Sequence, residues 1–274
     1  MSNISIIDTS IEDKIKEELT ASFQSKRQRI FSKIFGAALG SIPWVGGFLS
    51  AMKDFKSDEA QVKNNLLYEQ WLSEHTIKMK ILAETLMGVA KRLEDFPDEI
   101  NERLESEDYL QIVRKSFRIW DVSDTFEKRD LIRKLLTNAG AYKLVSDDLI
   151  RLFLDWLSLY HEIHFAVIKT IYQQTQVTRR QIWSEIDGSI VREDSMEADL
   201  FKMLIRDLSL GGVIRQRREI DYYGNFIKKS KPKNTSHSST LKSAFDDGEI
   251  YELTELGKQF VHYTMDEIVT RVGE

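Results

Sequence analysis

Residues 34–52 most restrict what this chain can fold into, because they read IFGAALGSIPWVGGFLSAM and contain no charged side chain. Lys33 and Lys53 flank the segment, and glycines and Pro43 interrupt it. A solvated loop is not this apolar, and an ordinary core helix contains less Gly and Pro. The segment must therefore be covered by the rest of the protein, by a partner or by lipid.

A single membrane-spanning helix needs about 20 apolar residues in a row. Pro43 and the Gly46-Gly47 pair interrupt this segment in the middle, so we expect two short apolar arms joined by a bend, a helical hairpin with Pro43, Trp44 and Phe48 at its tip. Burial of the hairpin at the centre of a helical bundle is the alternative that the sequence leaves open. The residues predicted to contact a membrane or a partner are Ile42, Pro43, Trp44, Val45, Phe48 and Leu49.

Helix formers dominate the rest of the chain, and the whole sequence of 274 residues has only 3 Pro and no Cys. The spacing of apolar residues predicts helices over 11–35, 57–94, 106–120, 124–139 and 146–160, with Gly140 ending the fourth. We expect them to form an antiparallel bundle over residues 1–160. The absence of Cys excludes a disulfide framework and thiolate zinc sites. The expected core of the bundle includes Trp120, Phe126, Leu131, Leu135, Phe153, Trp156 and Leu157.

The last third of the chain has a different order of elements. The pattern predicts helices over 161–174, 178–187 and about 194–210, then strands over 213–220 and 250–253, and a final helix from Thr254. This is the order of a winged-helix domain, here 161–274, so the fold class is mainly α with a small β-hairpin. Ile250 to Phe260, IYELTELGKQF, resembles the second wing strand and last helix of bacterial winged-helix proteins. Tyr251 and Leu253 should then point inward, and Thr254 should cap the final helix.

Basic side chains outnumber carboxylates in the predicted wing, and phosphate contacts supply most non-specific affinity for DNA. We expect the polar wing insertion, 222–248, to be mobile. The helices that would meet bases mix Arg179, Arg180, Lys202 and Arg206 with many carboxylates. A DNA-binding transcriptional regulator is therefore the alternative function. The wing residues predicted to contact nucleic acid are Arg215, Arg217, Arg218, Lys228, Lys229, Lys231 and Lys233.

No set of residues indicates catalysis. His161 and His164 are three positions apart, whereas the zinc-protease helix needs a spacing of four, and no third ligand lies nearby in the sequence. A phosphate-cradling loop and a dinucleotide motif are also absent. We therefore expect a protein that is not an enzyme and holds no metal or cofactor, with an uncharacterised enzyme as the third reading.

The order of a charged helix, the IPWVGG bend and a helical bundle resembles that of soluble helical proteins that shelter an apolar hairpin and release it at a membrane. The chain also resembles bacterial Abi-alpha-type proteins, which are linked to phage abortive infection. The segments Asp130 to Leu136, DLIRKLL, and Ser146 to Leu149, SDDL, and the closing winged helix carry the resemblance further along the chain. The resemblance implies no catalytic residues, and the basic wing insertion has no counterpart in the Abi-alpha-type proteins. It implies an antiviral defence or stress effector whose hairpin contacts a membrane or a protein partner under the control of the winged helix.

Charge and the N-terminus bear on location and partners. The net charge is −5, and each half of the chain carries slightly more carboxylates than cations, so any nucleic-acid contact must be local. The acidic N-terminus lacks the basic and then apolar order of a secretory signal. We expect a cytoplasmic protein that is peripheral to the inner membrane where the hairpin meets lipid, and that forms a homo-oligomer if it makes a pore.

Overall fold

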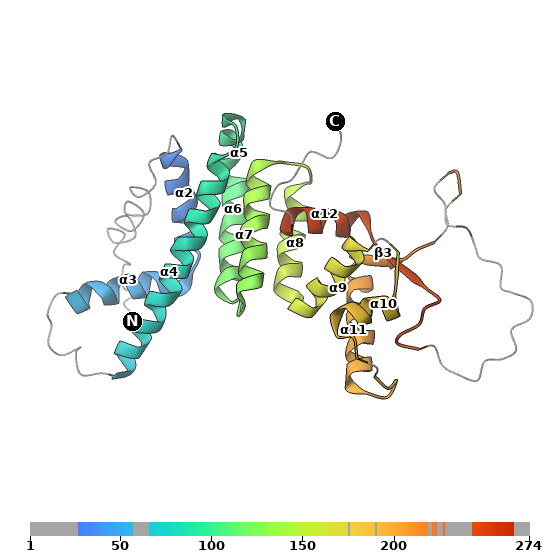
Figure 1. Cartoon of the computed structure of the whole chain (residues 1–274). Helices are drawn as coiled ribbons and strands as arrows, with labels where there is room; N and C mark the ends of the chain where they lie inside the picture. The colour runs from blue at the N-terminus through green and yellow to red at the C-terminus, as the bar shows by residue number, and fades with distance from the viewer. Residues whose placement is uncertain are drawn as a thin grey trace, which may run out of the picture. The chain divides into compact units, whose positions relative to one another are not determined.

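The computed structural model describes residues 27–56, 66–174, 176–189, 191–218, 221–223, 227 and 243–265. These residues form mainly helices, with one small three-stranded sheet (Figure 1). The chain divides into two compact units, Met1–Leu159 with Tyr263–Glu274 as unit 1, and Tyr160–His262 as unit 2. The division assigns the last twelve residues to unit 1, whereas the sequence pattern groups them with 161–262.

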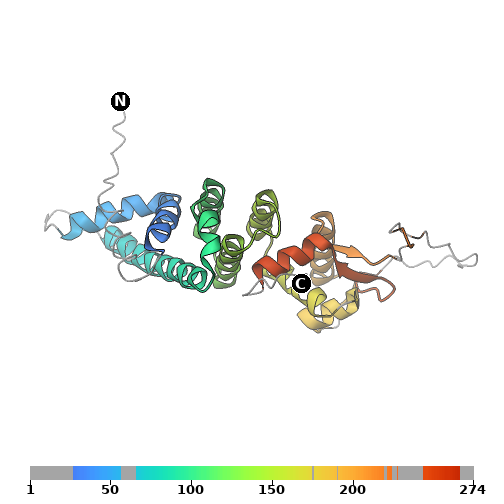
Figure 2. The same ribbon diagram turned by 90° about the horizontal axis from the view of Figure 1, so that it is seen from above.

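Unit 1 is helical throughout its described part. Helices α4, α6, α7 and α8 lie side by side, and α2 packs against α6 (Figure 1). Figure 2 looks nearly along the axes of α6 to α8. The helices predicted over 106–120, 124–139 and 146–160 are confirmed, while 11–26 and 57–65 of the first two lie outside the described residues. The bounds are α2 Gln28–Leu39, α3 Pro43–Lys56, α4 Leu66–Glu94, the 3-10 helix η1 Asp98–Ile100, α5 Asn101–Glu105, α6 Glu107–Asp121, α7 Phe126–Ala141 and α8 Asp147–Leu159.

Hydroxyl caps set the starts of three of these helices. The side-chain oxygens of Ser106, Thr125 and Ser146 each accept a hydrogen bond from the backbone N–H three residues further on, at 3.3–3.4 Å. Such a cap satisfies one of the N–H groups that have no partner inside the helix. The sequence therefore specifies where α6, α7 and α8 begin.

The core of unit 1 holds large side chains of α6 and α8, among them Tyr109, Trp120 and Phe153, which are at most 2% exposed. The prediction that Phe126 belongs to this core is wrong, because its side chain is 79% exposed. Phe126 is the first residue of α7, where the helix has only begun to run along its neighbours. An apolar residue at the start of a helix is thus weaker evidence for a buried side chain than an apolar residue in the middle of the helix.

Gly140 lies inside α7 and does not end it, so its predicted role as the stop is corrected. A Cβ atom at this position would lie 2.8 Å from Leu104 Cδ2 and 2.8 Å from the hydroxyl of Tyr109. That hydroxyl donates a hydrogen bond to the carbonyl oxygen of Leu136 at 3.1 Å. Close packing of α5 and α6 on α7 therefore explains the glycine.

Arg27 lies just before α2 and is 3% exposed. Its guanidinium donates to the carbonyl oxygens of Phe96 and Pro97 at 2.9 and 2.7 Å, and to Oδ1 of Asn101 at 2.6 Å. It also donates to the carbonyl oxygen of Leu93, in the last turn of α4. A positive group suits the negative end of a helix, so Arg27 ties the start of α2 to the end of α4.

Unit 2 combines short helices with the three-stranded sheet. Its antiparallel strands have the order β1-β3-β2, with Val177 opposite Tyr251 and Ile214 opposite Leu253. The two-residue strand β1 is too short to predict from alternation. The bounds are α9 Glu162–Gln173, β1 Val177–Thr178, α10 Arg179–Ile186, α11 Met196–Leu210, β2 Ile214–Gln216, β3 Ile250–Leu253 and α12 Glu255–Thr264, whose last two residues fall in unit 1.

The predicted inward direction of Tyr251 and Leu253 is confirmed, because both side chains are buried. Thr254 caps α12 as expected, since its Oγ1 accepts from the backbone N–H of Gly257 at 2.9 Å and donates to the carbonyl oxygen of Gly212 at 2.6 Å. Through these two hydrogen bonds, Thr254 caps α12 and joins the end of β3 to Gly212, in the turn that leads into β2.

Candidate functional site

The first candidate is the segment 34–52, which we call the apolar corner. It contains the end of α2 and most of α3, whose axes meet at 97°. The change of direction occurs over residues 40–42, and Pro43 is the first residue of α3, a position where its missing N–H costs nothing. Gly46 and Gly47 lie inside α3. The segment is thus a right-angled corner, whereas the sequence suggests a hairpin bent at the proline and the paired glycines.

Most of the side chains predicted to contact a membrane or partner face the interior of unit 1. Ile42, Val45, Phe48 and Leu49 are between 0 and 4% exposed, whereas Pro43 is exposed and Trp44 is partly exposed. Helix α2 packs against α6, and α3 packs against α4. In this structure the corner is therefore covered by the protein itself, and contact with lipid or a partner through these four residues would require it to open.

Trp44 connects the corner to two other helices of unit 1. Its indole Nε1 donates a hydrogen bond to Oδ1 of Asp121, at the end of α6, at 2.6 Å. Its ring lies edge-on to His75 of α4 at a centroid distance of 4.9 Å, and His75 stacks on Trp71 at 4.2 Å. Phe48 completes this aromatic cluster, 6.2 Å from Trp44. The cluster holds α3 against α4 and α6.

Within the described part of the chain, none of the helices is by itself long and apolar enough to cross a membrane. The pair formed by Gln28–Leu39 and Pro43–Ala51 passes the same test of length and composition when its two helices are taken together.

The second candidate is a groove in unit 2 of about 550 Å³, which we call the cationic groove. It is lined by residues of α10, α11, β2, β3 and the segment after β2, and its lining includes no carboxylate. Apolar and uncharged polar side chains such as Ile205, Ser209 and Gln216 fill the space between the charges. The basic residues that line it are Arg179, Lys202, Arg206, Arg215 and Arg218.

Two of these cations are held by the sheet. The guanidinium Nε of Arg179 donates to the hydroxyl of Tyr251 at 2.9 Å, and its Cζ lies 5.4 Å from the centre of the Tyr251 ring. Arg215 of β2 forms an ion pair with Glu252, directly opposite on β3, at 2.7 Å. The side chains of Arg215 and Glu252 are 45% and 30% exposed, so water weakens their ion pair.

Lys202 and Arg206 are four positions apart on α11 and so lie on the same face of the helix. Arg206 is 68% exposed and lies 3.6 Å from its neighbour Asp207. Lys202 lies 3.6 Å from Asp199 and 3.8 Å from the Glu193 carboxylate, and its ammonium group donates to the carbonyl oxygen of Glu193 at 3.3 Å. Exposed ion pairs at such distances are weak in water. Arg206 therefore remains available to an anion in the groove, whereas Lys202 is directed toward the carboxylates at the start of α11.

Carboxylates gather at the other end of α11. Glu193 and Asp194 precede the helix, and Glu197 and Asp199 lie in its first turn. The backbone N–H of Ala244 and the hydroxyl of Ser243 hydrogen-bond to Glu193 and lower its pKa. The pKa of Asp194 is lowered by its hydrogen bond from Arg192. The start of α11 is thus negative at neutral pH, and the groove side is positive.

The residues predicted for the nucleic-acid interface are only partly brought together. Arg215 and Arg218 line the groove, whereas Arg217 is exposed and is not among its lining residues. Lys228, Lys229, Lys231 and Lys233 lie outside the described residues. Sequence reasoning did not assign Arg179, Lys202 and Arg206 to the interface, because the two helices that contain them also carry many carboxylates. The spacing of Lys202 and Arg206 by four was the signal that places both on one helix face.

The histidine pair at the start of α9 has a structural role. Nδ1 of His164 accepts a hydrogen bond from the backbone N–H of His161 at 3.2 Å, and the His164 ring stacks on Tyr160 at 5.1 Å. His164 is buried, and His161 is exposed. In the described part of the chain no three His, Cys, Asp or Glu side chains gather into a group that could hold a metal ion.

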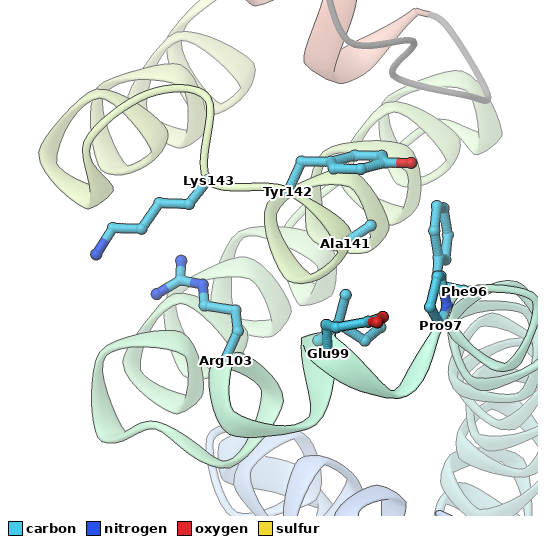
Figure 3. Close-up of a pocket in the computed structure, with 8 residues that line it drawn as sticks. Phe96, Pro97, Glu99, Arg103, Ala141, Tyr142 and Lys143 are labelled. Atoms are coloured by element: carbon cyan, nitrogen blue, oxygen red, sulfur yellow. The ribbon is translucent and has the colours of Figure 1, made fainter.

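A third candidate is a cavity of about 610 Å³ in unit 1, which lies between η1, α5 and the turn after α7 (Figure 3). The rings of Phe96 and Tyr142 meet edge-on at 5.5 Å on one side, and Arg103 and Lys143 lie on the other. Arg103 is committed to a bidentate pair with Asp147, and Glu99 adds a negative charge to the lining. The two rings suit an apolar or planar group. Because the lining carries both positive and negative side chains, the cavity favours neither anions nor cations.

Comparisons with protein-family models, with curated proteins and with solved structures find no match for this chain. The function must therefore be inferred from the chain's own residues. Of the three candidates, the cationic groove has the side chains that a ligand can reach most easily.

Proposed function

We propose that the chain is a non-enzymatic nucleic-acid-binding protein that holds a phosphate backbone in the cationic groove of unit 2. The observation that carries the proposal is that five basic side chains, from α10, α11, β2 and the segment after β2, line one groove whose lining has no carboxylate. Cations that neutralise phosphates release condensed counterions, and this supplies affinity that is independent of sequence. Four of the five are arginines, whose planar guanidinium groups fit phosphate oxygens better than an ammonium group does.

We infer in addition that unit 2 is a winged helix. The succession α9, β1, α10, α11, β2, β3 and α12 and the sheet order β1-β3-β2 support this inference. In helix-turn-helix proteins the second helix of the motif, here α11, lies against the nucleic acid. Residues of α11 between 202 and 210 line the cationic groove, so the groove and the inferred recognition helix share this element.

The proposal is tested with the full chain and a fluorescent oligonucleotide of about 20 nucleotides, long enough to cover such a groove. The double variant Arg206→Ala and Arg218→Ala removes two groove cations and should weaken binding about tenfold or more. The matched control is Arg180→Ala with Arg192→Ala, which removes the same charge from exposed ion pairs outside the groove. Equal loss of affinity in the two double variants would contradict a role for the groove.

A second candidate function is contact of the apolar corner with a membrane or a protein partner, as the resemblance to Abi-alpha-type proteins implies, with unit 2 as the regulatory module. What favours it is the length and composition of the α2 and α3 pair. Because four of its contact residues are buried, this function requires that the corner open.

Opening is tested by flotation of the protein with anionic lipid vesicles. The variant Asp121→Ala removes the acceptor of the Trp44 hydrogen bond and should increase the fraction that floats. Asp124→Ala removes an exposed carboxylate three residues further on and serves as the control. If the Asp121→Ala variant floats no more than the wild type, the corner is a core element only.

A further inference from the structure

We infer that the cationic groove takes single-stranded nucleic acid, whose bases stack on the exposed pair Tyr222 and Tyr223. The inference rests on the proposed function and adds to it the form of the nucleic acid. It depends on three observations in unit 2, which are the charge at the start of α11, the position of the groove cations and the exposure of the two tyrosines.

The negative charge at the start of α11 disfavours binding to a duplex. A recognition helix in the major groove contacts bases through its N-terminal residues and lies between two phosphate backbones. Here Glu197 and Asp199 occupy the first turn, and Glu193 and Asp194 come just before it. Inserting this end into a duplex would bring four carboxylates close to phosphates, which costs free energy at any sequence.

Three of the groove cations favour one backbone path away from that end, whereas Lys202 lies near Glu193 and Asp199. Arg206 lies in the second half of α11, and Arg215 and Arg218 come from β2 and the residues after it. A strand that follows these residues avoids the acidic start of α11. Proteins that bind single strands without sequence preference combine such a positive groove with aromatic side chains that stack on the bases.

The aromatic side chains are supplied four and five residues after Arg218. Tyr222 is 98% exposed and Tyr223 is 84% exposed, and their rings meet edge-on at a centroid distance of 5.6 Å. Four residues of chain span at most about 14 Å, so Tyr222 lies within reach of a strand that passes Arg218. In a duplex the base faces are stacked on one another, whereas each base of a single strand has a face available to a tyrosine.

The test compares the full chain on one sequence in three forms, single-stranded DNA, single-stranded RNA and duplex DNA, by fluorescence anisotropy at one salt concentration. The wild type should bind the single strands more tightly than the duplex. Changing both Tyr222→Ala and Tyr223→Ala should weaken single-strand binding about tenfold or more and leave duplex binding within about twofold. Changing both Tyr222→Phe and Tyr223→Phe keeps the rings and should keep the affinity.

The outcomes separate this inference from the proposed function. If the duplex binds as tightly as the single strands, or if the alanine variant binds single strands like the wild type, single-strand recognition is wrong. If either result occurs and the double variant Arg206→Ala and Arg218→Ala still binds more weakly than the wild type, phosphate binding in the groove is retained and only single-strand recognition is rejected. If none of the three nucleic acids binds to the wild type, the proposed function fails as well. A tighter fit to RNA than to DNA, or the reverse, identifies the natural ligand and supports the inference.

Discussion

Trp44 of α3 donates a hydrogen bond from its indole Nε1 to Oδ1 of Asp121, at the end of α6, at 2.6 Å. The two residues are 77 positions apart in the chain. A residue that the sequence places at the tip of an apolar hairpin is thus fixed to the helical bundle of unit 1. The bond, together with the contacts of Trp44 to His75 and Phe48, attaches the apolar corner to α4 and α6.

We expect Trp44→Phe to lower the free energy of unfolding by about 1–2 kcal/mol, because it removes a hydrogen bond to a carboxylate at a partly exposed site. Urea unfolding followed by circular dichroism measures the change. Asp121→Asn keeps an acceptor oxygen and should cost less than Trp44→Phe. Equal stability of the Trp44→Phe variant and the wild type would show that the bond does not hold the corner.

The Arg103 and Asp147 pair makes unit 1 sensitive to acid. Arg103 donates to both carboxylate oxygens of Asp147, at 2.6 and 2.9 Å. Burial raises the pKa of Asp147, but the hydrogen bonds and positive charge of Arg103 outweigh it, so the pKa lies below its ordinary value. The contribution of the pair to stability is therefore complete above the unfolded pKa, about 3.9, and is lost as the pH falls through the lowered native pKa.

Asp147→Asn should accordingly lower the free energy of unfolding by about 2–4 kcal/mol at neutral pH, since it leaves a partly buried guanidinium without its partner charge. The difference from the wild type should shrink as the pH falls below about 4. Asp148→Asn, an exposed neighbour, serves as the control and should change stability little. A difference that stays constant from neutral to acid pH would contradict this assignment.

Two helical glycines should respond to alanine with opposite signs. Gly140→Ala places a Cβ atom 2.8 Å from the Tyr109 hydroxyl and should destabilise unit 1 by about 1–3 kcal/mol through overpacking. Gly47→Ala, inside α3, meets nothing within 4 Å and should stabilise by about 0.5–1 kcal/mol through helix propensity. Thermal unfolding of both variants is the measurement, and a stabilised Gly140→Ala variant would refute the packing explanation.

Periodic apolar residues and capping hydroxyls made most helices predictable, because these signals are local. Ser106 and Thr178 start α6 and α10 where the sequence places helix starts. The role of Pro43 was not predictable in this way, since a proline at the first position of a helix and a proline in a bend look alike in the sequence. Whether Val45 faces lipid or the interior likewise depends on the helices that pack around it.

The cationic groove shows the same limit for a site. Arg215 and Arg218 could be found from the sequence, because basic residues are dense in that stretch. Arg179 and Arg206 could not, since their helices also carry many carboxylates, and only the folded unit shows which cations line the groove. The carboxylates at the start of α11 can also be found from the sequence. Their effect on nucleic-acid binding depends on which end of the helix borders the groove, and this is known only from the fold.

The salt dependence of nucleic-acid binding tests the central claim most directly. For the wild type, the logarithm of the binding constant should fall linearly with the logarithm of the salt concentration. The double variant Arg206→Ala and Arg218→Ala should reduce the steepness of this slope by about 1.4 on a single strand, or about 1.8 on a duplex, if both arginines neutralise phosphates. A flat wild-type response, or one slope shared by the wild type and the variant, would contradict phosphate binding in the cationic groove.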